Sequence, residues 1–501
     1  MKKVLIFSLF VAQFSMNAVT WKVGATQTYT SLSSIVNLVQ NSDTVKIDGG
    51  VYLNDPMQWT KNNLVFIGLG TGSNRSIMKW NGGDIANGKG IWVFGNPATT
   101  GSITVDNVVF EGARISDANG ANGAGIRYQA KDLTIRNCLF NSCQNGILEG
   151  GSYSGSVISI INSEFNNNGY EFIGNANSGY EHSIYISSQT DSLLVRNCYF
   201  HDPRGEGNII KTRAQKSYIL YNYIDEANGQ GSWEINIAQG GLNVIIGNVI
   251  IQGANSINHG MISYDAASNP IENFYFINNT VINKYVGNFN YFNVTPTSGI
   301  NKYKVYNNIF TKVSGASMSN FIAGTLGAAL DTVANRILPN YTSVGFVNAT
   351  TDNYHLTSSA ASFINNSVNA GVASSGYNLN ALYEYVAFTS SLAPRVMSGS
   401  ASDIGAYEFA SPTSVSENKG LSQIVCYPNP AIDAFTIDLG TLTYNKAELV
   451  IFNTEGKEVK RVLLKESKTN VNPGSDLKKG LYYYKVCTDG AMISSGKVIL
   501  H

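Results

Sequence analysis

Residues suited to acid–base chemistry gather in strand-like segments near the middle of the chain. In the segment NIIKTRA, Lys211 and Arg213 alternate with Ile210, Thr212 and Ala214. Successive side chains of a β-strand point to opposite faces, so an inward-facing apolar set would turn Lys211 and Arg213 outwards. Two basic groups on one outward face could hold a carboxylate and take up a proton.

Two neighbouring segments extend this face by the same alternation. HSIYIS (182–187) and SWEINI (232–237) each place two polar side chains between apolar ones. The offset from the NIIKTRA strand to the SWEINI strand is 23 residues in both outward columns (234 − 211 and 236 − 213), which we interpret as one coil. The predicted outward columns are Tyr185–Lys211–Glu234 and Ser187–Arg213–Asn236.

Such a patch has the residue types needed to remove a proton next to a carboxylate. That reaction needs a cation for the carboxylate, a base for the proton and an acid for the departing oxygen. At about 6 Å and an effective dielectric near 20, the Arg213 charge would destabilise charged Lys211 by about 3 kcal/mol, or about two pKa units. Glu234 would act in the opposite direction. The alternative is a surface ion ladder that contributes about 0–1 kcal/mol per pair.

The catalytic roles that follow are hypotheses. Lys211 would be the base, Arg213 would hold the carboxylate, and His182 or Tyr185 would donate a proton to the leaving oxygen. The residues expected to contact a substrate lie at strand entries, in a preceding turn and in neighbouring coils: Glu234, Asn236, Asn208, His201 and Arg127. Glu149, in an earlier coil like Arg127, could extend the same groove.

Other acidic groups are weaker candidates. The turn HDPRGEG (201–207) could bind Ca²⁺ or a substrate, or be only a polar turn. Asp225 and Glu226 form a carboxylate pair of the kind used in glycoside hydrolysis, although a turn is the simpler interpretation. Ca²⁺ is therefore the one cofactor that the sequence leaves open, and the cysteine spacings match no zinc pattern.

A repeat positions all of these residues. An Asn near the end of an apolar strand recurs at intervals of 25 to 35 residues through the middle of the chain. The residues are Asn107, Asn137, Asn162, Asn197, Asn222, Asn248, Asn279 and Asn308. Such a period is typical of a solenoid, whose coils stack about 4.8 Å apart and bury a continuous core. Aligned Asn side chains could then form a hydrogen-bonded ladder, with Cys138 and Cys198 in equivalent places.

The composition bounds the partners of the protein. The chain has 501 residues, with 34 basic and 34 acidic side chains and so no net charge, which argues against a nucleic-acid partner. Lys2, Lys3, the apolar stretch to Phe14 and then Ala18 form a signal-peptide pattern over residues 1–18. No second long apolar run follows, so we expect a soluble exported monomer in which disulfides are permitted, with Cys426–Cys487 as a conceivable pair.

Composition also divides the mature chain. Residues 19–409 carry the repeat, beginning with an expected short amphipathic helix over 31–39 and closing with SDIGAYEF (402–409). Residues 410–420 have the composition of a linker. Residues 421–501 hold 18 charged residues and strand patterns at 433–439, 447–453, 458–464, 480–487 and 494–500, which predict a small antiparallel β-sandwich.

Two parts of the chain resemble known families. TWKVGATQTYTSLSSIVNLV and DTVKIDGGVY near the start, with DIGAYEF at 403–409, resemble the pectate-lyase-like superfamily. That resemblance implies an all-β fold, a right-handed parallel β-helix over residues 19–409. The tail segments CYPNPAIDAFTIDL, VIFNTEGKEV, LKKGLYYYKV and SGKVIL resemble the C-terminal sorting domain of the type IX secretion system. This second resemblance implies recognition by that machinery and transit across the outer membrane to the cell surface or medium.

The resemblances and the patch together indicate a secreted carbohydrate-active protein. The leading hypothesis is a polysaccharide lyase that cleaves a uronate-containing polysaccharide by β-elimination. A surface adhesin or glycan-binding protein without catalysis is the alternative, and a hydrolase or epimerase on the same scaffold stays open because fold does not determine reaction.

Overall fold

The computed structural model describes residues 18–95, 101–151, 153–170, 179–226, 228–266, 269–296, 299–410, 424–440, 444–454, 457–474, 477–489 and 491–500. They divide into two compact units, one up to residue 411 and one from residue 412 onwards. The predicted signal peptide, except residue 18, and the predicted linker beyond residue 410 lie outside the described residues and stay predictions. Within the described part of the chain, no helix is long and apolar enough to span a membrane.

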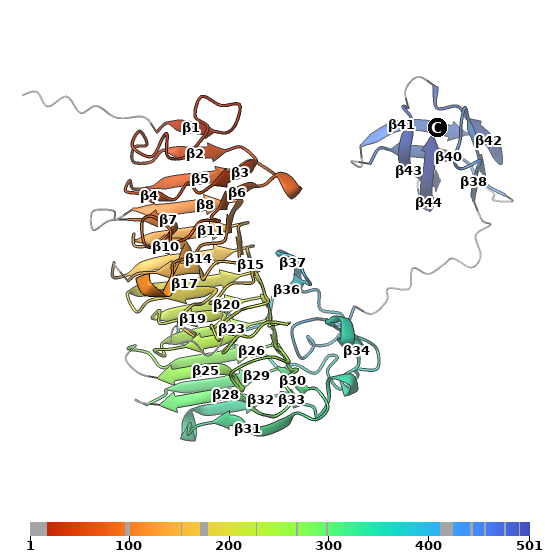
Figure 1. Cartoon of the computed structure of the whole chain (residues 1–501). Coiled ribbons are helices and arrows are strands. Elements are labelled where there is room, and N and C mark those ends of the chain that lie inside the picture. The colour runs from red at the N-terminus through yellow and green to blue at the C-terminus, as the bar shows by residue number, and fades with distance from the viewer. Residues whose placement is uncertain are drawn as a thin grey trace, which may run out of the picture. The chain divides into compact units, whose positions relative to one another are not determined.

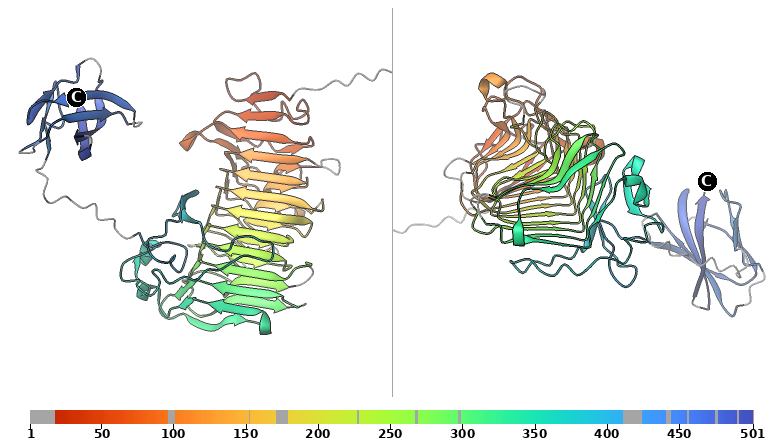
Figure 2. Two further views of the ribbon diagram at one scale, coloured as in Figure 1. Left: turned by 180° about the vertical axis from the view of Figure 1, so that it is seen from behind. Right: turned by 90° about the horizontal axis from the view of Figure 1, so that it is seen from below.

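The first unit is the predicted right-handed parallel β-helix, in which three parallel sheets run along one stack of coils (Figure 1). Figure 2 shows the same coils from behind and from below. Sheet A consists of β1 (Thr20–Val23), β2 (Thr44–Ile47), β5 (Leu64–Gly68), β8 (Ser102–Asp106), β11 (Asp132–Arg136), β14 (Ser156–Ile161), β17 (Thr190–Arg196), β20 (Lys216–Leu220), β23 (Leu242–Ile246), β26 (Asn273–Ile277), β29 (Lys302–Tyr306) and β32 (Leu330–Val333). Sheet B consists of β3 (Gly50–Leu53), β6 (Ser76–Lys79), β9 (Val108–Glu111), β12 (Leu139–Asn141), β15 (Glu164–Asn166), β18 (Tyr199–His201), β21 (Tyr223–Asp225), β24 (Val249–Gln252), β27 (Thr280–Asn283), β30 (Ile309–Lys312) and β33 (Arg336–Ile337). Sheet C consists of β4 (Met57–Trp59), β7 (Gly90–Phe94), β10 (Ala124–Tyr128), β13 (Asn145–Glu149), β16 (Ile184–Ile186), β19 (Ile210–Thr212), β22 (Ile235–Ile237), β25 (Gly260–Ala266), β28 (Asn288–Pro296) and β31 (Ser317–Ala323).

Stacked side chains fill the space between the sheets. Phe110, Phe140, Phe165 and Phe200 lie one per coil, with consecutive ring centroids 5.2, 4.8 and 4.7 Å apart. Each ring is fully buried, so the equivalence of Phe140, Phe165 and Phe200 read from the repeat is confirmed. The next coils place Ile224, Ile250, Val281 and Phe310 at the same point, so the apolar core is continuous along the solenoid.

The predicted Asn ladder is split between two adjacent positions. Asn222 donates to Asn248 (2.9 Å), Asn248 to Asn279 (2.9 Å) and Asn279 to Asn308 (3.1 Å), which confirms the ladder in the later coils. The four earlier Asn residues stand one position before this ladder, and their backbone adopts the left-handed conformation that Asn tolerates. Cys138 and Cys198 lie at the ladder position in those coils, where Ser163 Oγ and Asn222 Oδ1 accept hydrogen bonds from their N–H groups.

The segment 31–39 is not the helix that its apolar spacing suggested. It forms consecutive turns, and the Leu32 and Ile35 carbonyls accept the hydrogen bonds of the residues that follow. Leu32, Ile35 and Val39 are fully buried, as the spacing implied. Asp55 in the next coil accepts the N–H of Leu32 at 2.8 Å, so the start of the segment is tied to the solenoid rather than wound into a helix.

The coils end at β33, and residues 338–409 form a strap that runs back along the outer faces of sheets A and B (Figure 2). The strap contains β34 (Phe346–Asn348), β35 (Asn353–Leu356), β36 (Tyr383–Val386) and β37 (Ser391–Pro394). Tyr354, Tyr385 and Tyr407 of the strap pack on the outer side of sheet B. Near its end, Arg395 donates to Glu408 at 2.7 Å inside the protein, so the segment predicted to close the fold is anchored by a buried ion pair. One-turn 3-10 helices lie in the loops at Gly72–Asn74, Asp117–Asn119, Gly327–Ala329, Tyr341–Ser343 and Ala349–Thr351.

The second unit is the predicted antiparallel β-sandwich. One sheet holds β38 (Val425–Tyr427), β39 (Phe435–Asp438) and β42 (Lys468–Val471). The other holds β40 (Ala447–Phe452), β41 (Glu458–Leu464), β43 (Gly480–Thr488) and β44 (Ala491–Leu500). The unit has its own apolar core, including Phe435, Leu449 and Val486. Cys426 and Cys487 are free thiols, so the pairing considered for them is wrong.

Candidate functional site

The outward face of sheet C carries the polar patch that the alternation predicts. In β19, Lys211 is partly exposed between the buried Ile210 and Thr212. Tyr185 occupies the same place between Ile184 and Ile186 in β16. We call this surface, formed by Tyr185, Lys211, Arg213, Asn236, Ser263 and Asp265, the Lys211 patch.

The register of the patch differs from the predicted columns. Backbone pairing places Tyr185 beside Lys211 and Lys211 beside Asn236. The step from β19 to β22 is therefore 25 residues (236 − 211), two more than predicted, because the intervening turn is longer. Asn236 thus continues the column of Lys211 instead of that of Arg213, and Glu234 belongs to neither column.

Lys211, Arg213 and Tyr185 form one interacting group. The Lys211 Nζ lies 5.9 Å from the centre of the Tyr185 ring, and the Arg213 guanidinium carbon lies 5.3 Å from it. Arg213 also donates a hydrogen bond to the Tyr185 hydroxyl. Burial and then the Arg213 charge lower the pKa of Lys211, while Asp265 opposes them. Lys211 is consequently easier to deprotonate than a surface lysine, as the sequence argument required.

His182 lies behind the patch rather than on it. Its side chain is only 1% exposed, and its Nδ1 accepts the N–H of Asn208 at 3.0 Å. Burial, with Lys211 and Arg213, holds the pKa of His182 well below its usual value, so the ring is neutral and its proton is on Nε2. The His182 and Tyr185 rings stack with centroids 5.8 Å apart. His182 is therefore placed to position Tyr185.

Asn208 is structural in this fold and not a surface contact as predicted. Its side chain is 5% exposed, and its Oδ1 accepts the N–H of Trp233 in the next coil at 3.2 Å. A side chain at a strand entry is in reach of the backbone of the next coil, and that bond leaves it turned away from solvent. Asn208 therefore does not belong to the group that could contact a substrate.

Asp265 completes the patch and was missed from the sequence. It lies in β25 beyond Asn236 and Ser263, which pair with each other. Burial raises the pKa of Asp265, while hydrogen bonds from Thr295 and Ser263 and the charges of Lys211 and Arg213 act to lower it. The alternation of Ser263 and Asp265 with apolar neighbours in GMISYDA was the signal that could have found it.

A hollow of about 440 Å³ adjoins the patch on the side of the earlier coils. Arg127 of β10 lies in the same outward column as Tyr185, two coils before it, as the registers through Leu148 show. Arg127 and Tyr185 both line the hollow, together with Glu149, Tyr180 and Glu181. Burial lowers the pKa of Arg127, and Glu149 opposes this effect. Arg127 therefore lies where the sequence placed it, next to the patch.

Glu234 points into the core, which contradicts its predicted outward position. The side chain is completely buried, and neither carboxyl oxygen has a hydrogen-bond partner among the described residues. Burial and then the charge of Glu226 raise the pKa of Glu234 well above its usual value. Glu226 is also completely buried and Asp225 is 3% exposed. The carboxylate pair considered for a glycoside hydrolase is therefore closed to water and substrate.

His201 lies on sheet B, on a different face from the Lys211 patch. Its Nε2 is 3.0 Å from Glu164 and its Nδ1 is 2.9 Å from Asp202. Burial acts to lower the pKa of His201, but the hydrogen bonds to Asp202 and Glu164 outweigh it and raise the pKa to about 9. His201 is therefore not part of the Lys211 patch, because a turn separates the face of β18 from that of β19.

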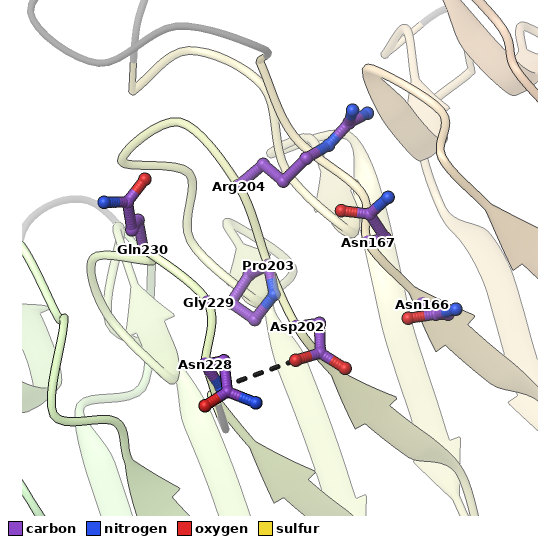
Figure 3. Close-up of a pocket in the computed structure, with 8 residues that line it drawn as sticks. All are labelled: Asn166, Asn167, Asp202, Pro203, Arg204, Asn228, Gly229 and Gln230. Carbon is purple, nitrogen blue, oxygen red and sulfur yellow. Dashed lines mark hydrogen bonds between the residues drawn. The ribbon is translucent and has the colours of Figure 1, made fainter.

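A second hollow, of about 390 Å³, lies over the turns that follow sheet B (Figure 3). It includes Asp202, whose Oδ1 accepts the N–H of Asn228 at 3.4 Å. The lining residues are Asn166, Asn167, Asp202, Pro203, Arg204, Asn228, Gly229 and Gln230. The turn 201–207 considered for Ca²⁺ thus contributes to a polar hollow. Within the described ranges, no group of three or more His, Cys, Asp or Glu side chains is arranged to hold a metal ion.

The comparisons with known proteins concern the two units separately. Residues 425–501 match the family described as the secretion system C-terminal sorting domain. The match identifies the β-sandwich and supports secretion or export to the cell surface, with the type IX machinery as the implied partner. No curated protein matches the sequence of this chain.

A similar solved structure is that of the PL6 family alginate lyase AlyGC. The sequences are 15% identical, the match covers 65% of this chain and 39% of that chain, and the TM-score is 0.35. This chain thus matches about two fifths of the length of that enzyme. At this TM-score the likeness carries no argument about this chain.

Proposed function

We propose that the β-helix is a polysaccharide lyase that cleaves a uronate-containing polysaccharide by β-elimination. The observation that carries the proposal is the position of Lys211, a half-buried lysine with a lowered pKa, beside Arg213 and Tyr185 on an open strand face. A base of reduced pKa next to a fixed cation and a hydroxyl is the set that this reaction requires.

Each group has one task in the elimination. Arg213 binds the uronate carboxylate, and so stabilises the negative charge that develops when the neighbouring C–H bond breaks. The Nζ of neutral Lys211 takes that proton. The electron pair of the C–H bond forms a carbon–carbon double bond, and the bond to the glycosidic oxygen breaks. The Tyr185 hydroxyl, which accepts a hydrogen bond from Arg213, gives its own proton to the departing oxygen.

Tyr185 is preferred to His182 as the proton donor. His182 is neutral and buried, and a neutral imidazole is a weak acid. Tyr185 is partly exposed on the same face as Lys211. Asn236, directly beside Lys211, is 8% exposed, and its Oδ1, unlike that of Asn208, has no hydrogen-bond partner among the described residues, so it is placed to accept a hydrogen bond from a sugar hydroxyl.

The test is the appearance of the unsaturated product, which absorbs near 235 nm when elimination forms a double bond conjugated with the carboxyl group. The full chain is assayed with alginate, pectate, chondroitin and heparin-type glycans, with and without Ca²⁺. We expect a rise in absorbance that Lys211→Ala abolishes. The control variant Lys216→Ala should leave the rise intact, because Lys216 is a surface lysine of β20 paired with Asp191 of the preceding coil. No rise on any glycan would refute the lyase, and glycan binding without a rise would make the protein a non-catalytic binder.

We further propose that the sorting domain directs the protein across the outer membrane through the type IX machinery. The match of residues 425–501 supports this, as does the separate core of the second unit. Deleting those residues should leave the β-helix inside the cell envelope, whereas the full chain should be found at the surface or in the medium. Normal export of the truncated chain would contradict the proposal.

A further inference from the structure

The hollow beside the Lys211 patch holds ionisable side chains that the elimination step does not use. Arg127 and Glu181 both line it, and Tyr185 belongs to the hollow and the patch alike. We propose that this hollow is a subsite for a second uronate residue of the polysaccharide, with Arg127 as the partner of its carboxylate and Glu181 as the hydrogen-bond partner of its hydroxyl groups. The class of ligand rests on the proposed lyase function.

Arg127 has donor capacity left for a ligand. Its side chain is partly buried, and its Nε has no hydrogen-bond partner among the residues described. The neighbouring Glu149 is held by the backbone, because Oε1 accepts the N–H of Gly151 at 2.6 Å and Oε2 accepts the N–H of Ser187 at 2.8 Å. A uronate carboxylate can meet the planar guanidinium with two parallel hydrogen bonds.

Glu181 is an unusual acid for a surface hollow. The residue is only 1% exposed, and one carboxyl oxygen, Oε2, is buried without a partner in the described part of the chain. Burial raises the pKa of Glu181 to about 8, the backbone N–H groups of Glu181 and Tyr180 oppose this, and the charge of Asp117 adds to it. Arg127, Glu149, Tyr180 and Tyr185 are the other ionisable groups that line the hollow.

The protonation state of Glu181 suits an anionic ligand. Below about pH 8 the side chain is a neutral acid that can donate to a sugar oxygen without repelling a uronate. Above that pH it becomes a carboxylate, which loses its proton for donation and repels the ligand. The volume of the hollow, about 440 Å³, lies within the usual range for small-ligand sites. Tyr180, which is 74% exposed, offers an aromatic ring at the rim.

Binding of defined oligouronates, measured by calorimetry, tests the subsite without relying on turnover. The probes are tetramers to hexamers of mannuronate, guluronate and galacturonate, and the parent is the full chain with Lys211→Ala, which also removes another titrating group. We expect Arg127→Gln and Glu181→Ala to weaken binding about tenfold or more near pH 6, because the first variant removes the cationic partner of the uronate carboxylate and the second removes the hydrogen-bond partner of a sugar hydroxyl. Arg136→Gln, a surface arginine on sheet A, is the matched control and should bind like the parent.

The Glu181→Gln variant separates a hydrogen-bond role from a structural one. It should bind like the parent near pH 6 and keep its affinity near pH 9, where the parent weakens about tenfold. Unchanged affinity in Arg127→Gln and Glu181→Ala, together with a positive lyase assay, would overturn the subsite and leave the function standing. The expected binding pattern without any lyase activity would overturn the lyase and keep the subsite. No binding and no activity on any uronate would overturn both.

Discussion

Two carboxyl groups inside the solenoid, those of Glu226 and Glu234, should make the stability of the β-helix depend on pH. Both side chains are completely buried. Glu226 Oε2 accepts the N–H of Gly253 at 2.7 Å, whereas Glu226 Oε1 and both oxygens of Glu234 have no hydrogen-bond partner within the described residues. Burial raises the pKa of both groups, and the charge of Glu226 raises that of Glu234 further. No cation is among the groups that shift the pKa of either glutamate. The two side chains therefore stay buried only if they keep their protons and remain uncharged.

The sign and the size of the effect follow from proton linkage. In the unfolded chain a glutamate loses its proton near its ordinary pKa of about 4.3, whereas the folded chain retains it to a much higher pH. Unfolding therefore releases a proton over that window, and the free energy of unfolding falls as pH rises through it. Each retained proton contributes about 1.4 kcal/mol per pH unit. Between about pH 5.5 and about pH 7.5 this is about 3 kcal/mol per proton, a large part of a typical stability of about 5–15 kcal/mol.

The variant Glu234→Gln isolates this effect, because glutamine has nearly the same shape and stays neutral at every pH. The unfolding free energy of both chains is compared as a slope against pH. The slope should be less negative in Glu234→Gln than in the native chain, by about 1.4 kcal/mol per pH unit. The β-helix transition of the full chain is followed by thermal and urea unfolding across this pH range. The sorting domain contains neither glutamate, so its own transition is an internal reference.

Glu111→Gln is the matched control. Its carboxyl group lies at the surface, 2.5 Å from Lys79, and its replacement should leave the pH dependence of the β-helix unchanged. Parallel pH curves for the native chain and Glu234→Gln would refute the reasoning. The reasoning would also be refuted if the unfolding free energy of the native β-helix rose with pH over this range and that of Glu234→Gln depended on pH just as steeply.

Three further changes test the patch, the strap and the ladder. Asp265→Asn removes the charge that opposes the lowering of the pKa of Lys211, so the acidic limb of the kcat/KM profile should move down by up to about one pH unit, and an unmoved limb would contradict the contact. Arg395→Met leaves Glu408 buried without its cation and should destabilise the strap by about 3–5 kcal/mol, which limited proteolysis of residues 338–409 would detect. Asn279→Ala leaves its ladder partners unpaired and should lower the unfolding free energy by about 1–3 kcal/mol, whereas a neutral effect would show that the ladder does not contribute.

The solenoid could be predicted because each coil repeats the same local requirement. The left-handed turn after most sheet A strands is filled by Asn or Gly, and one inward position of sheet B is a Phe in the four consecutive strands β9, β12, β15 and β18. The split between the two Asn columns could not be predicted. In the sequence, both kinds of Asn simply stand beside an apolar residue. Only the structure separates them: Asn197 has a left-handed backbone, whereas Asn222 donates to the next Asn of the ladder.

The sequence predicted which face of the strand each side chain of the candidate site points to. It did not predict which residues lie beside one another in neighbouring strands. Alternation alone turned Lys211, Arg213 and Tyr185 to one face. The column through Lys211 then advances by 26, 25, 27 and 30 residues from Tyr185 to Asn293, because the turns between sheets differ in length. A constant offset therefore fails after one coil. With a constant offset, Asn236 was assigned to the column of Arg213 instead of that of Lys211. Asp265, which lies two coils beyond Arg213, was not predicted.

Glu234 shows where alternation itself fails. The residue precedes Ile235 at the entry of β22, as Ile209 precedes Ile210 and Met261 precedes Ile262. Ile209 and Met261 are buried in the core together with the residues that follow them. The chain bends into sheet C at this corner, so two successive side chains turn inwards before the strict alternation begins. Strict alternation predicts an outward side chain for a glutamate at this position, but the side chain enters the core. It is tolerated there only as an acid that keeps its proton. For this reason Glu234, which is wrong as a substrate contact, is the residue expected to make the stability of the fold depend on pH.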